Sequence, residues 1–316
     1  MDKKDLKIVF FGTPEFAVAS LDRLVGEGYN VGAVVTMPDK VAGRGHKLLK
    51  SDVKVYAEQK GLPLLQPEKL KSPEFVEALR AIDADLFIVI AFRMLPEVVW
   101  SMPRLGTFNL HGSLLPKYRG AAPINRAIMN GERETGITTF FLRHEIDTGD
   151  MIEQRSTEIT DDDNAGTVHD RLMEMGADMV ASTVKSILDG TLHTVPQPDG
   201  EFIAAPKIFK EDCMIDWTMP AERIHNQVRG LSPYPAAFTT IRDSNGKEYT
   251  AKIFETAMTE NAAIDVAPGQ VISDGRQMWI KAADRLLEIR SLQPAGKKRM
   301  DTKAYLLGYH PESTIK

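Results

Sequence analysis

Residues 84–92 read ADLFIVIAF, and this almost unbroken apolar run indicates a β-strand that is covered on both faces. Such strands belong to parallel sheets, because the crossover helices of a parallel sheet pack on both of its faces. Further segments of strand character occur at 6–11, 29–36, 107–110 and 138–142. Helical segments are predicted between them, from Thr13 as N-cap to Val25 and at 50–60, 123–130 and 160–188. This alternation predicts a doubly wound, mostly parallel α/β sheet.

The turn Gly12-Thr13-Pro14 follows the first predicted strand, where a dinucleotide-binding fingerprint would lie. The chain has neither the G-x-G-x-x-G pattern nor a P-loop at this turn. A tight strand-to-helix turn is therefore favoured here over NAD or ATP binding.

The second half of the chain changes character. Residues 191–200 read TLHTVPQPDG, a polar stretch with two prolines that predicts a linker, and a short helix is predicted at 221–230. Five strands are then predicted at 237–242, 248–256, 269–273, 277–282 and 286–292, with Asn245-Gly246 and Asp274-Gly275 as hairpin turns. So many strands in so short a stretch favour a small β-barrel that resembles the oligonucleotide-binding (OB) type. We predict domains at 1–190 and 207–316, joined by a linker at 191–206.

Composition limits the class of protein. The 316 residues are 43% hydrophobic and 26% charged, which is ordinary for a soluble globular protein. No apolar run approaches the ~18 residues of a membrane span, and the start does not resemble a signal peptide, so we expect a cytoplasmic protein without membrane association. The single Cys213 excludes an internal disulfide. Residues 206–316 carry 16 Lys and Arg against 14 Asp and Glu, although the whole chain has a net charge of −5.

Residues 108–120, FNLHGSLLPKYRG, hold the strongest functional signal. Asn109 and His111 are two positions apart, so on a strand their side chains point to the same side. The Gly-Ser-Leu-Leu-Pro run that follows cannot continue the strand, and we expect its backbone groups to be available to a ligand. A lone histidine is usually a core or loop residue, and a lone acid such as Asp147 is often only part of a solvated turn. Together, Asn109, His111 and Asp147 favour a catalytic set in which the carboxylate orients the imidazole.

Other polar groups have weaker interpretations. The sequence has no H-E-x-x-H motif and no clustered His/Cys set, so no metal site is predicted. Asp161, Asp162 and Asp163 are expected to place negative charge on the first turn of a helix. Residues 38–47, PDKVAGRGHK, should form a mobile surface loop, or else a phosphate-contacting lid with Arg44 at its tip. Lys297, Lys298 and Arg299 form a basic cluster that is either a solvated surface or a set of phosphate contacts.

Taken together, these residues resemble the formyltetrahydrofolate-dependent formyltransferases, and the resemblance covers nearly the whole chain. It is carried by FFGTPEFA, PDKVAGRGHK, NLHGSLLPKYRGAAP and IDTGDMI, and further on by IDW (215–217), RGLSPYP (229–235) and LQPAGKKRM (292–300). It implies a Rossmann-like catalytic domain with Asn109, His111 and Asp147 as the triad. It also implies 10-formyltetrahydrofolate as co-substrate, with a folate-binding turn at Ser113, Leu114, Leu115 and Pro116. For the pteridine we expect an apolar slot that includes Phe92 and Leu95.

The AGRG loop and the C-terminal motifs resemble the branch of the family that acts on initiator methionyl-tRNA. The resemblance implies that the formyl group is transferred to the methionine amino group. It assigns Arg44 to the acceptor end of the tRNA and the barrel to the tRNA body, and Lys297, Lys298 and Arg299 could add phosphate contacts there. Two positions depart from the family pattern: Ala236 stands where glycine is usual, and Glu145 where a small residue is common.

Three other functions are compatible with parts of the sequence. A UDP-amino-sugar N-formyltransferase would share the central motif but would be expected to lack the AGRG loop and to differ in the C-terminal motifs. A purine-pathway formyltransferase would end near the linker. A non-catalytic RNA-binding or folate-sensing protein would not need Asn109, His111 and Asp147 intact.

Overall fold

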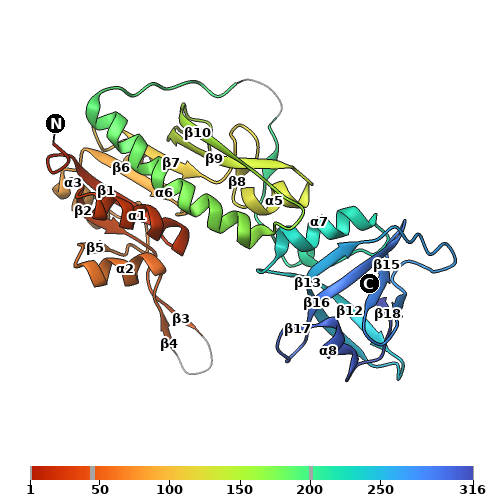
Figure 1. Ribbon diagram of the computed structural model, residues 1–316. Coiled ribbons are helices and arrows are strands. Elements are labelled where there is room, and N and C mark those ends of the chain that lie inside the picture. The colour runs from red at the N-terminus through yellow and green to blue at the C-terminus, as the bar shows by residue number, and fades with distance from the viewer. Residues whose placement is uncertain (1, 43–46, 199–201, 316) are drawn as a thin grey trace. The chain divides into compact units, whose positions relative to one another are not determined.

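The computed structural model describes residues 2–42, 47–198 and 202–315, which form two compact units (Figure 1). The first unit comprises Met1–Gly120, Gly136–Thr157 and His169–Ala204. The second comprises Ala121–Thr135, Glu158–Val168 and Ala205–Lys316. The second unit thus includes two segments from within the predicted first domain, 1–190. The domain boundaries at 190 and 207 remain predictions.

The first unit is built on a seven-stranded sheet with the order β10-β9-β7-β6-β1-β2-β5. Its strands are β1 (Lys7–Gly12), β2 (Asn30–Val35), β5 (Leu64–Leu65), β6 (Leu86–Ile90), β7 (Thr107–His111), β9 (Glu134–Phe141) and β10 (Met151–Glu158). The strands from β7 to β5 pair in parallel, whereas β9 runs antiparallel to β7. The five residues of β6 are all buried, as the run at 84–92 predicts. The predicted doubly wound, mostly parallel sheet is confirmed.

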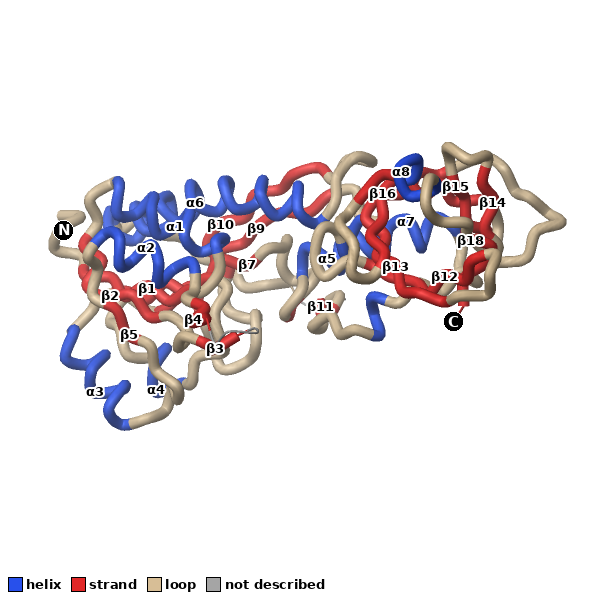
Figure 2. Tube along the Cα trace, turned by 90° about the horizontal axis from the view of Figure 1, so that it is seen from below, coloured by secondary structure: helices blue, strands red, loops and turns tan. Residues whose placement is uncertain are grey.

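Helices cover both faces of this sheet. Figure 2 shows α1, α2 and α6 on one face and α3 and α4 on the other. Their bounds are α1 (Glu15–Gly26), α2 (Asp52–Lys60), α3 (Pro73–Ile82), α4 (Glu97–Trp100) and α6 (Ala165–Asp189). On the α3 side, side chains from β1 and β6 form one core cluster with Phe75, Val76 and Leu79 of α3. Because β1, β6 and β7 run in parallel, their carboxyl ends lie at the same edge of the sheet.

Two predicted helix starts are wrong. The cap position of α1 is Pro14 rather than Thr13, whose hydroxyl is buried with no partner among the residues described. α6 begins at Ala165 rather than near 160, so the three aspartates precede the helix. Asp163 is buried there and accepts hydrogen bonds from the Thr160 amide at 2.9 Å and the Thr167 hydroxyl at 2.8 Å. Its role is to close the turn before the helix.

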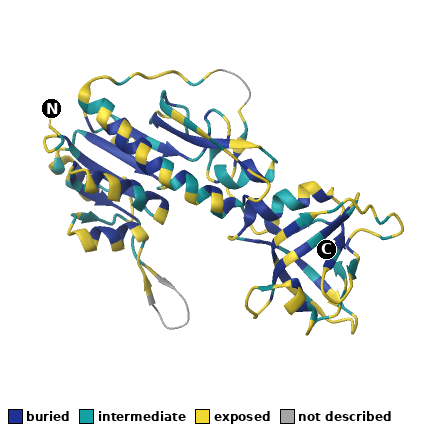
Figure 3. Cartoon of the chain, viewed as in Figure 1, coloured by how far each residue is buried: buried dark blue, intermediate teal, exposed yellow. Residues whose placement is uncertain are grey.

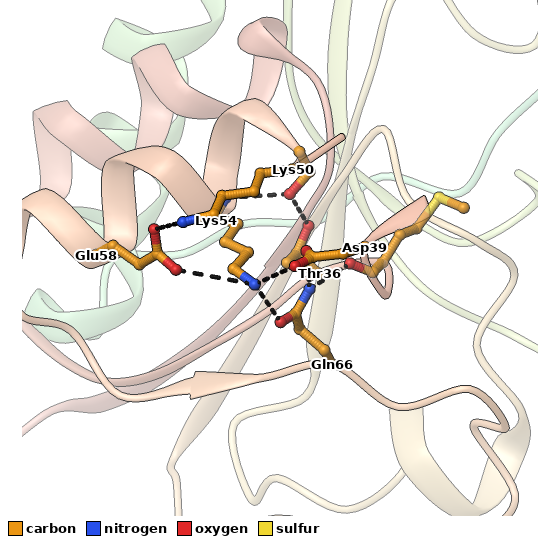
Figure 4. A network of polar contacts seen from close by, with 8 residues as sticks. Thr36, Asp39, Lys50, Lys54, Glu58 and Gln66 are labelled. Carbon is orange, nitrogen blue, oxygen red and sulfur yellow. Dashed lines mark hydrogen bonds and ion pairs between the residues drawn. The ribbon is translucent and has the colours of Figure 1, made fainter. Parts of the chain in front are cut away.

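The described part of 38–47 contains strands where an irregular loop was predicted. β3 (Lys40–Ala42) and β4 (Lys47–Leu49) pair as an antiparallel hairpin. Figure 4 shows a polar network at the base of this hairpin, centred on the buried Lys54. Lys54 donates to Asp39 at 2.6 Å and to Gln66 at 2.9 Å, and Gln66 donates to the second oxygen of Asp39. The ammonium of Lys54 and the Gln66 amide lower the pKa of Asp39.

The second unit contains a nearly closed antiparallel sheet with the order β14-β15-β16-β13-β12-β18, and β17 pairs with β16. The strands are β12 (Ala237–Asp243), β13 (Glu248–Met258), β14 (Val271–Ser273), β15 (Met278–Lys281), β16 (Leu286–Pro294), β17 (Met300–Asp301) and β18 (Pro311–Ile315). A bridge between Gln270 and Ser313 joins the two edges, so the predicted small barrel is confirmed. The five predicted strands correspond to β12–β16.

Helices complete the second unit. They are α5 (Pro123–Met129), the 3₁₀ turn η1 (Glu211–Cys213), α7 (Ala221–Leu231) and α8 (Thr302–Leu306). Ile224, Val228 and Leu231 of α7 pack into the barrel core with Tyr305 of α8. Figure 3 shows the result as buried strands with exposed residues on the outer helix faces. Two short strands, β8 (Arg119–Gly120) and β11 (Ala204–Ala205), pair separately.

Candidate active site

Strand β7 places Asn109 and His111 on one side at its carboxyl end, as the two-residue spacing predicts. His111 is buried, and its Nε2 lies 2.8 Å from the carbonyl oxygen of Tyr118. A carbonyl only accepts hydrogen bonds, so Nε2 must carry a proton. The nitrogen at which His111 can gain or lose a proton is therefore Nδ1. Asn109 is partly exposed, and its side-chain amide makes no hydrogen bond to any residue that the structure describes.

Asp147 comes from the turn between β9 and β10 and faces the same imidazole. Its Oδ2 lies 3.8 Å from Nδ1 of His111, which is ion-pair range but too long for a hydrogen bond. The same oxygen accepts a hydrogen bond from the Gly120 amide at 3.0 Å. Catalytic contacts of this kind often tighten when substrate binds. The structure thus brings His111 and Asp147 together beside the end of β7.

The Asp147 turn is tightly constrained. Asp147 has a left-handed backbone with φ of 54°, which few residues other than glycine adopt without cost. At Gly149 an added Cβ would lie 1.6 Å from the carbonyl oxygen of Phe141. Any larger residue at 149 fits only if the turn or the Phe141 backbone shifts, which would disturb the main chain next to Asp147.

We expect Gly149→Ala to lower both stability and turnover, because the new methyl group cannot fit without moving the turn or the Phe141 backbone. Overpacking of this kind costs roughly 1–3 kcal/mol of unfolding free energy. Thermal unfolding and kcat measured on the same preparation check this. Gly26→Ala is the matched control, because an added Cβ at Gly26 meets nothing within 4 Å. A Gly149→Ala protein as stable and active as the control would show that the turn is not sterically fixed.

The predicted folate-binding turn is more rigid than expected. Ser113 and Leu115 are buried, whereas Leu114 and Pro116 are partly exposed. The expectation that the backbone here is available to a ligand is wrong for several groups. The carbonyl oxygen of Ser113 accepts from the Thr138 hydroxyl, which in turn accepts from the Leu115 amide. The Leu115 carbonyl oxygen accepts from Gln154, and that of Leu114 from the Lys117 amide.

The two predicted slot residues differ in exposure. Phe92 is partly exposed and packs edge-on against Phe11, with ring centroids 5.7 Å apart. Leu95 is only 6% exposed and belongs to the core cluster under α3. A ligand at this edge would therefore meet the ring of Phe92 before the side chain of Leu95. Both assignments remain predictions.

The residues predicted to contact tRNA are only partly described. Arg44 lies outside the described residues. Arg299 donates to Ser291 at 2.7 Å and to Glu255, and it lies 4.6 Å from the centroid of the Phe254 ring. Lys297 and Lys298 are exposed, and their ammonium groups have no partner within the described chain. Of this cluster, the two lysines are the cations available to a partner.

Sequence reasoning missed the residues that bond to His111 and to the Asp147 turn. Tyr118 and Gly120 bond His111 and Asp147 through backbone atoms, which carry no side-chain signal. Gln197 donates to the carbonyl oxygens of Asp147 and Gly149, although it lies in the segment predicted to be a linker. The one available signal was that Tyr118 and Gly120 lie within the central motif.

Comparison with known proteins identifies the family. A formyl transferase model matches residues 6–184, and a model described as formyl transferase, C-terminal domain, matches residues 207–310. The chain belongs to the formyl transferase family. A methionyl-tRNA formyltransferase of Bacteroides fragilis is 54% identical over 321 residues, covering 100% of this chain and 99% of that protein. Another, of Porphyromonas gingivalis, is 46% identical over 314 residues, covering 98% and 97%.

Solved structures show the same fold. HypX from Aquifex aeolicus, in complex with tetrahydrofolic acid, has a TM-score of 0.64 at 20% identity, covering 95% of this chain and 46% of that one. An N-formyltransferase from Helicobacter canadensis, in complex with folinic acid and dTDP-3-aminofucose, has a TM-score of 0.63 at 19% identity, covering 93% and 100%. At these identities the likeness concerns the fold alone.

A cavity of about 350 Å³ is lined by residues of the second unit of this formyl transferase. Its charged lining is balanced, with Arg133, Arg229 and Arg290 against Asp161, Asp162 and Glu222. Burial lowers the pKa of His225, which also lines it, to about 4, so this histidine adds no positive charge near neutral pH. The cavity is therefore poorly suited to a phosphate.

No described group of three or more His, Cys, Asp or Glu side chains is arranged to hold a metal ion. None of the described helices is both long enough and apolar enough to cross a membrane.

Proposed function

We propose that this chain transfers the formyl group of 10-formyltetrahydrofolate to the amino group of methionine esterified to initiator tRNA. The observation that carries the proposal is the arrangement at the end of β7. There the Nδ1 of His111 faces Asp147 at 3.8 Å, and the Asn109 amide has no partner among the described residues. The names of the curated relatives, at 54% and 46% identity over the full chain, support the choice of acceptor.

The chemistry follows from these three side chains. The neutral methionine amine attacks the formyl carbon, and a tetrahedral intermediate forms with an oxyanion and an ammonium. Asn109 donates its amide N–H to the oxyanion, the kind of contact that strengthens as charge develops. The amine loses one proton, N10 of the folate gains one, and the bond between N10 and the formyl carbon breaks. His111 moves the proton at Nδ1, and Asp147 stabilises the imidazolium.

For the folate we propose the sheet edge near Phe92 and the turn of Ser113, Leu114, Leu115 and Pro116. Leu114 and Pro116 offer partly exposed apolar surface, whereas Ser113 and Leu115 keep the turn rigid. Such a slot offers apolar contact to the flat pteridine ring, and a small number of polar groups must pair with the amino and carbonyl groups of the ring. Leu95 would support this slot from beneath.

For the tRNA we propose Arg44 at the acceptor end and the barrel at the tRNA body, with Lys297 and Lys298 as phosphate contacts. Because charged initiator tRNA is made and used in the cytoplasm, we place the reaction there. Arg299 contributes less, since its guanidinium already bonds Ser291 and Glu255.

We expect the double variant Lys297→Ala/Lys298→Ala to weaken the salt dependence of tRNA binding. Each lost phosphate contact should reduce the slope of log K against log salt by roughly 1. The dissociation constant for charged tRNA, measured over a salt series, gives this slope. Lys69→Ala/Lys71→Ala, at two exposed positions of the first unit, removes the same charge as a control. Equal slopes for both double variants would rule out a specific role for 297 and 298.

The acceptor is tested by a direct comparison. The enzyme is given 10-formyltetrahydrofolate with either charged initiator tRNA or a UDP-amino sugar, and formylated product is measured. Product from the tRNA alone is the expected result. Product from the amino sugar alone would replace the proposal by sugar N-formylation, and the absence of both products would favour a binding or sensing role.

A further inference from the structure

Three consecutive residues, Tyr118 to Gly120, lie beside the His111–Asp147 pair, and the first and last of them bond to it. The Tyr118 carbonyl oxygen accepts from Nε2 of His111, and the Gly120 amide donates to Oδ2 of Asp147. The residue between them, Arg119, donates from Nε and Nη2 to a single oxygen, Oε1 of Gln197, at 3.1 and 2.6 Å. Gln197 is therefore bonded to the same three-residue segment, Tyr118 to Gly120, that bonds both members of the pair.

The Gln197 side chain has only one sensible orientation. Arg119 can only donate, so the oxygen of the amide must face the guanidinium and the nitrogen must face the other way. That nitrogen, Nε2, donates to the carbonyl oxygen of Asp147 at 2.7 Å and to that of Gly149 at 3.0 Å. Both carbonyls belong to the turn in which Asp147 has its left-handed backbone. Gln197 thus fixes the main chain from which the Asp147 carboxylate projects.

The position of Gln197 in the chain makes this contact unusual. It follows α6, in the segment that leads from the first unit to the second. Two residues earlier, Val195 and Met151 exchange two backbone hydrogen bonds, at 2.8 and 2.9 Å. The beginning of this segment is therefore attached to β10 and to the turn before it, rather than loosely connecting two units.

We propose that Gln197 is a positioning residue for Asp147, and that Arg119 sets the orientation of its amide. The connecting segment then forms part of the support for the catalytic pair. The inference rests on the proposed function, because it gives Asp147 a role in the transfer.

Gln197→Leu tests this by keeping the bulk of the side chain while removing both its donors and its acceptor. We expect kcat for charged initiator tRNA to fall by roughly 10- to 100-fold, the scale of loss caused by small displacements of a catalytic group. The KM for 10-formyltetrahydrofolate should be unchanged. Gln197→Glu should be equally impaired, because it keeps the acceptor for Arg119 but loses the donor to the two carbonyls. Gln59→Leu, at an exposed position of α2, is the matched control and should behave as wild type.

Two measurements separate positioning from general stabilisation. If Gln197 acts through Asp147, Gln197→Leu should cost little further activity in an Asp147→Asn background, since the two changes would not add. Hydrogen exchange of the Gly120 amide, which bonds Oδ2 of Asp147, should become faster in Gln197→Leu but not in Gln59→Leu. Unchanged exchange and unchanged kcat would overturn the inference, and so would fully additive losses.

The exchange measurement also separates this inference from the proposed function. It needs no formyl acceptor, so it tests whether Gln197 fixes the Asp147 turn, whichever substrate the enzyme formylates. If the wild-type protein formylates no tRNA, the proposed function fails, while faster exchange in Gln197→Leu would still establish that the turn is held by Gln197.

Discussion

His111→Ala is expected to lower kcat for formyl transfer by roughly 10²–10⁴-fold, the usual contribution of a positioned general acid–base group. The reason is geometric. Nε2 is occupied by the Tyr118 carbonyl, so only Nδ1, which faces Asp147, can exchange a proton during the reaction. Steady-state kinetics with charged initiator tRNA gives kcat, and equilibrium binding of a folate analogue shows whether the pocket is intact.

A second histidine provides the control for this change. The side chain of His144 is 86% exposed and its nearest acid is Glu97 at 3.6 Å, so His144→Ala should leave kcat unchanged. A similar loss in both variants would point to a general effect of removing a histidine from this region. An unchanged kcat in His111→Ala would exclude His111 from the mechanism.

Asn109→Ala is expected to lower kcat by roughly 10²–10³-fold, as removal of a single oxyanion donor typically does. It should leave the thermal midpoint unchanged, because the Asn109 amide makes no hydrogen bond to the described residues that could be lost. Kinetics and thermal unfolding of the same protein sample provide both values. A large drop in stability with little change in kcat would assign Asn109 to the structure and not to the chemistry.

Much of the catalytic framework is predictable from local sequence. The run at 84–92 predicts β6 because a strand buried on both faces needs apolar side chains on both of its sides. The spacing of Asn109 and His111 predicts their common side because strand side chains alternate. The approach of Asp147 was expected from the resemblance to a known family, and the 3.8 Å distance is consistent with it. Helix α3 was missed although Ser72 and Pro73 give a standard start signal.

Other features could not be predicted from local sequence, because they depend on contacts between residues that are far apart in the chain. The β3–β4 hairpin has strands of three residues, too short for a periodic signal, and it is anchored through Lys54 and Gln66. The sequence around Gln197 predicts a linker, because Gln197 stands between two prolines in a mostly polar stretch. Its bonds to Asp147 and Gly149 span 50 and 48 residues of chain. An acidic residue such as Asp163, which closes a turn before the helix and does not belong to its first turn, makes the helix seem to start several residues too early.

The most direct test is a crystal structure of the enzyme with a non-transferable analogue of 10-formyltetrahydrofolate. The predicted result places the formyl oxygen roughly 2.7–3.1 Å from the Asn109 amide, the range of an effective oxyanion donor, with the Nδ1 of His111 on the side of the attacking amine. A folate bound elsewhere, or a formyl group pointing away from Asn109 and His111, would contradict the proposed catalytic site.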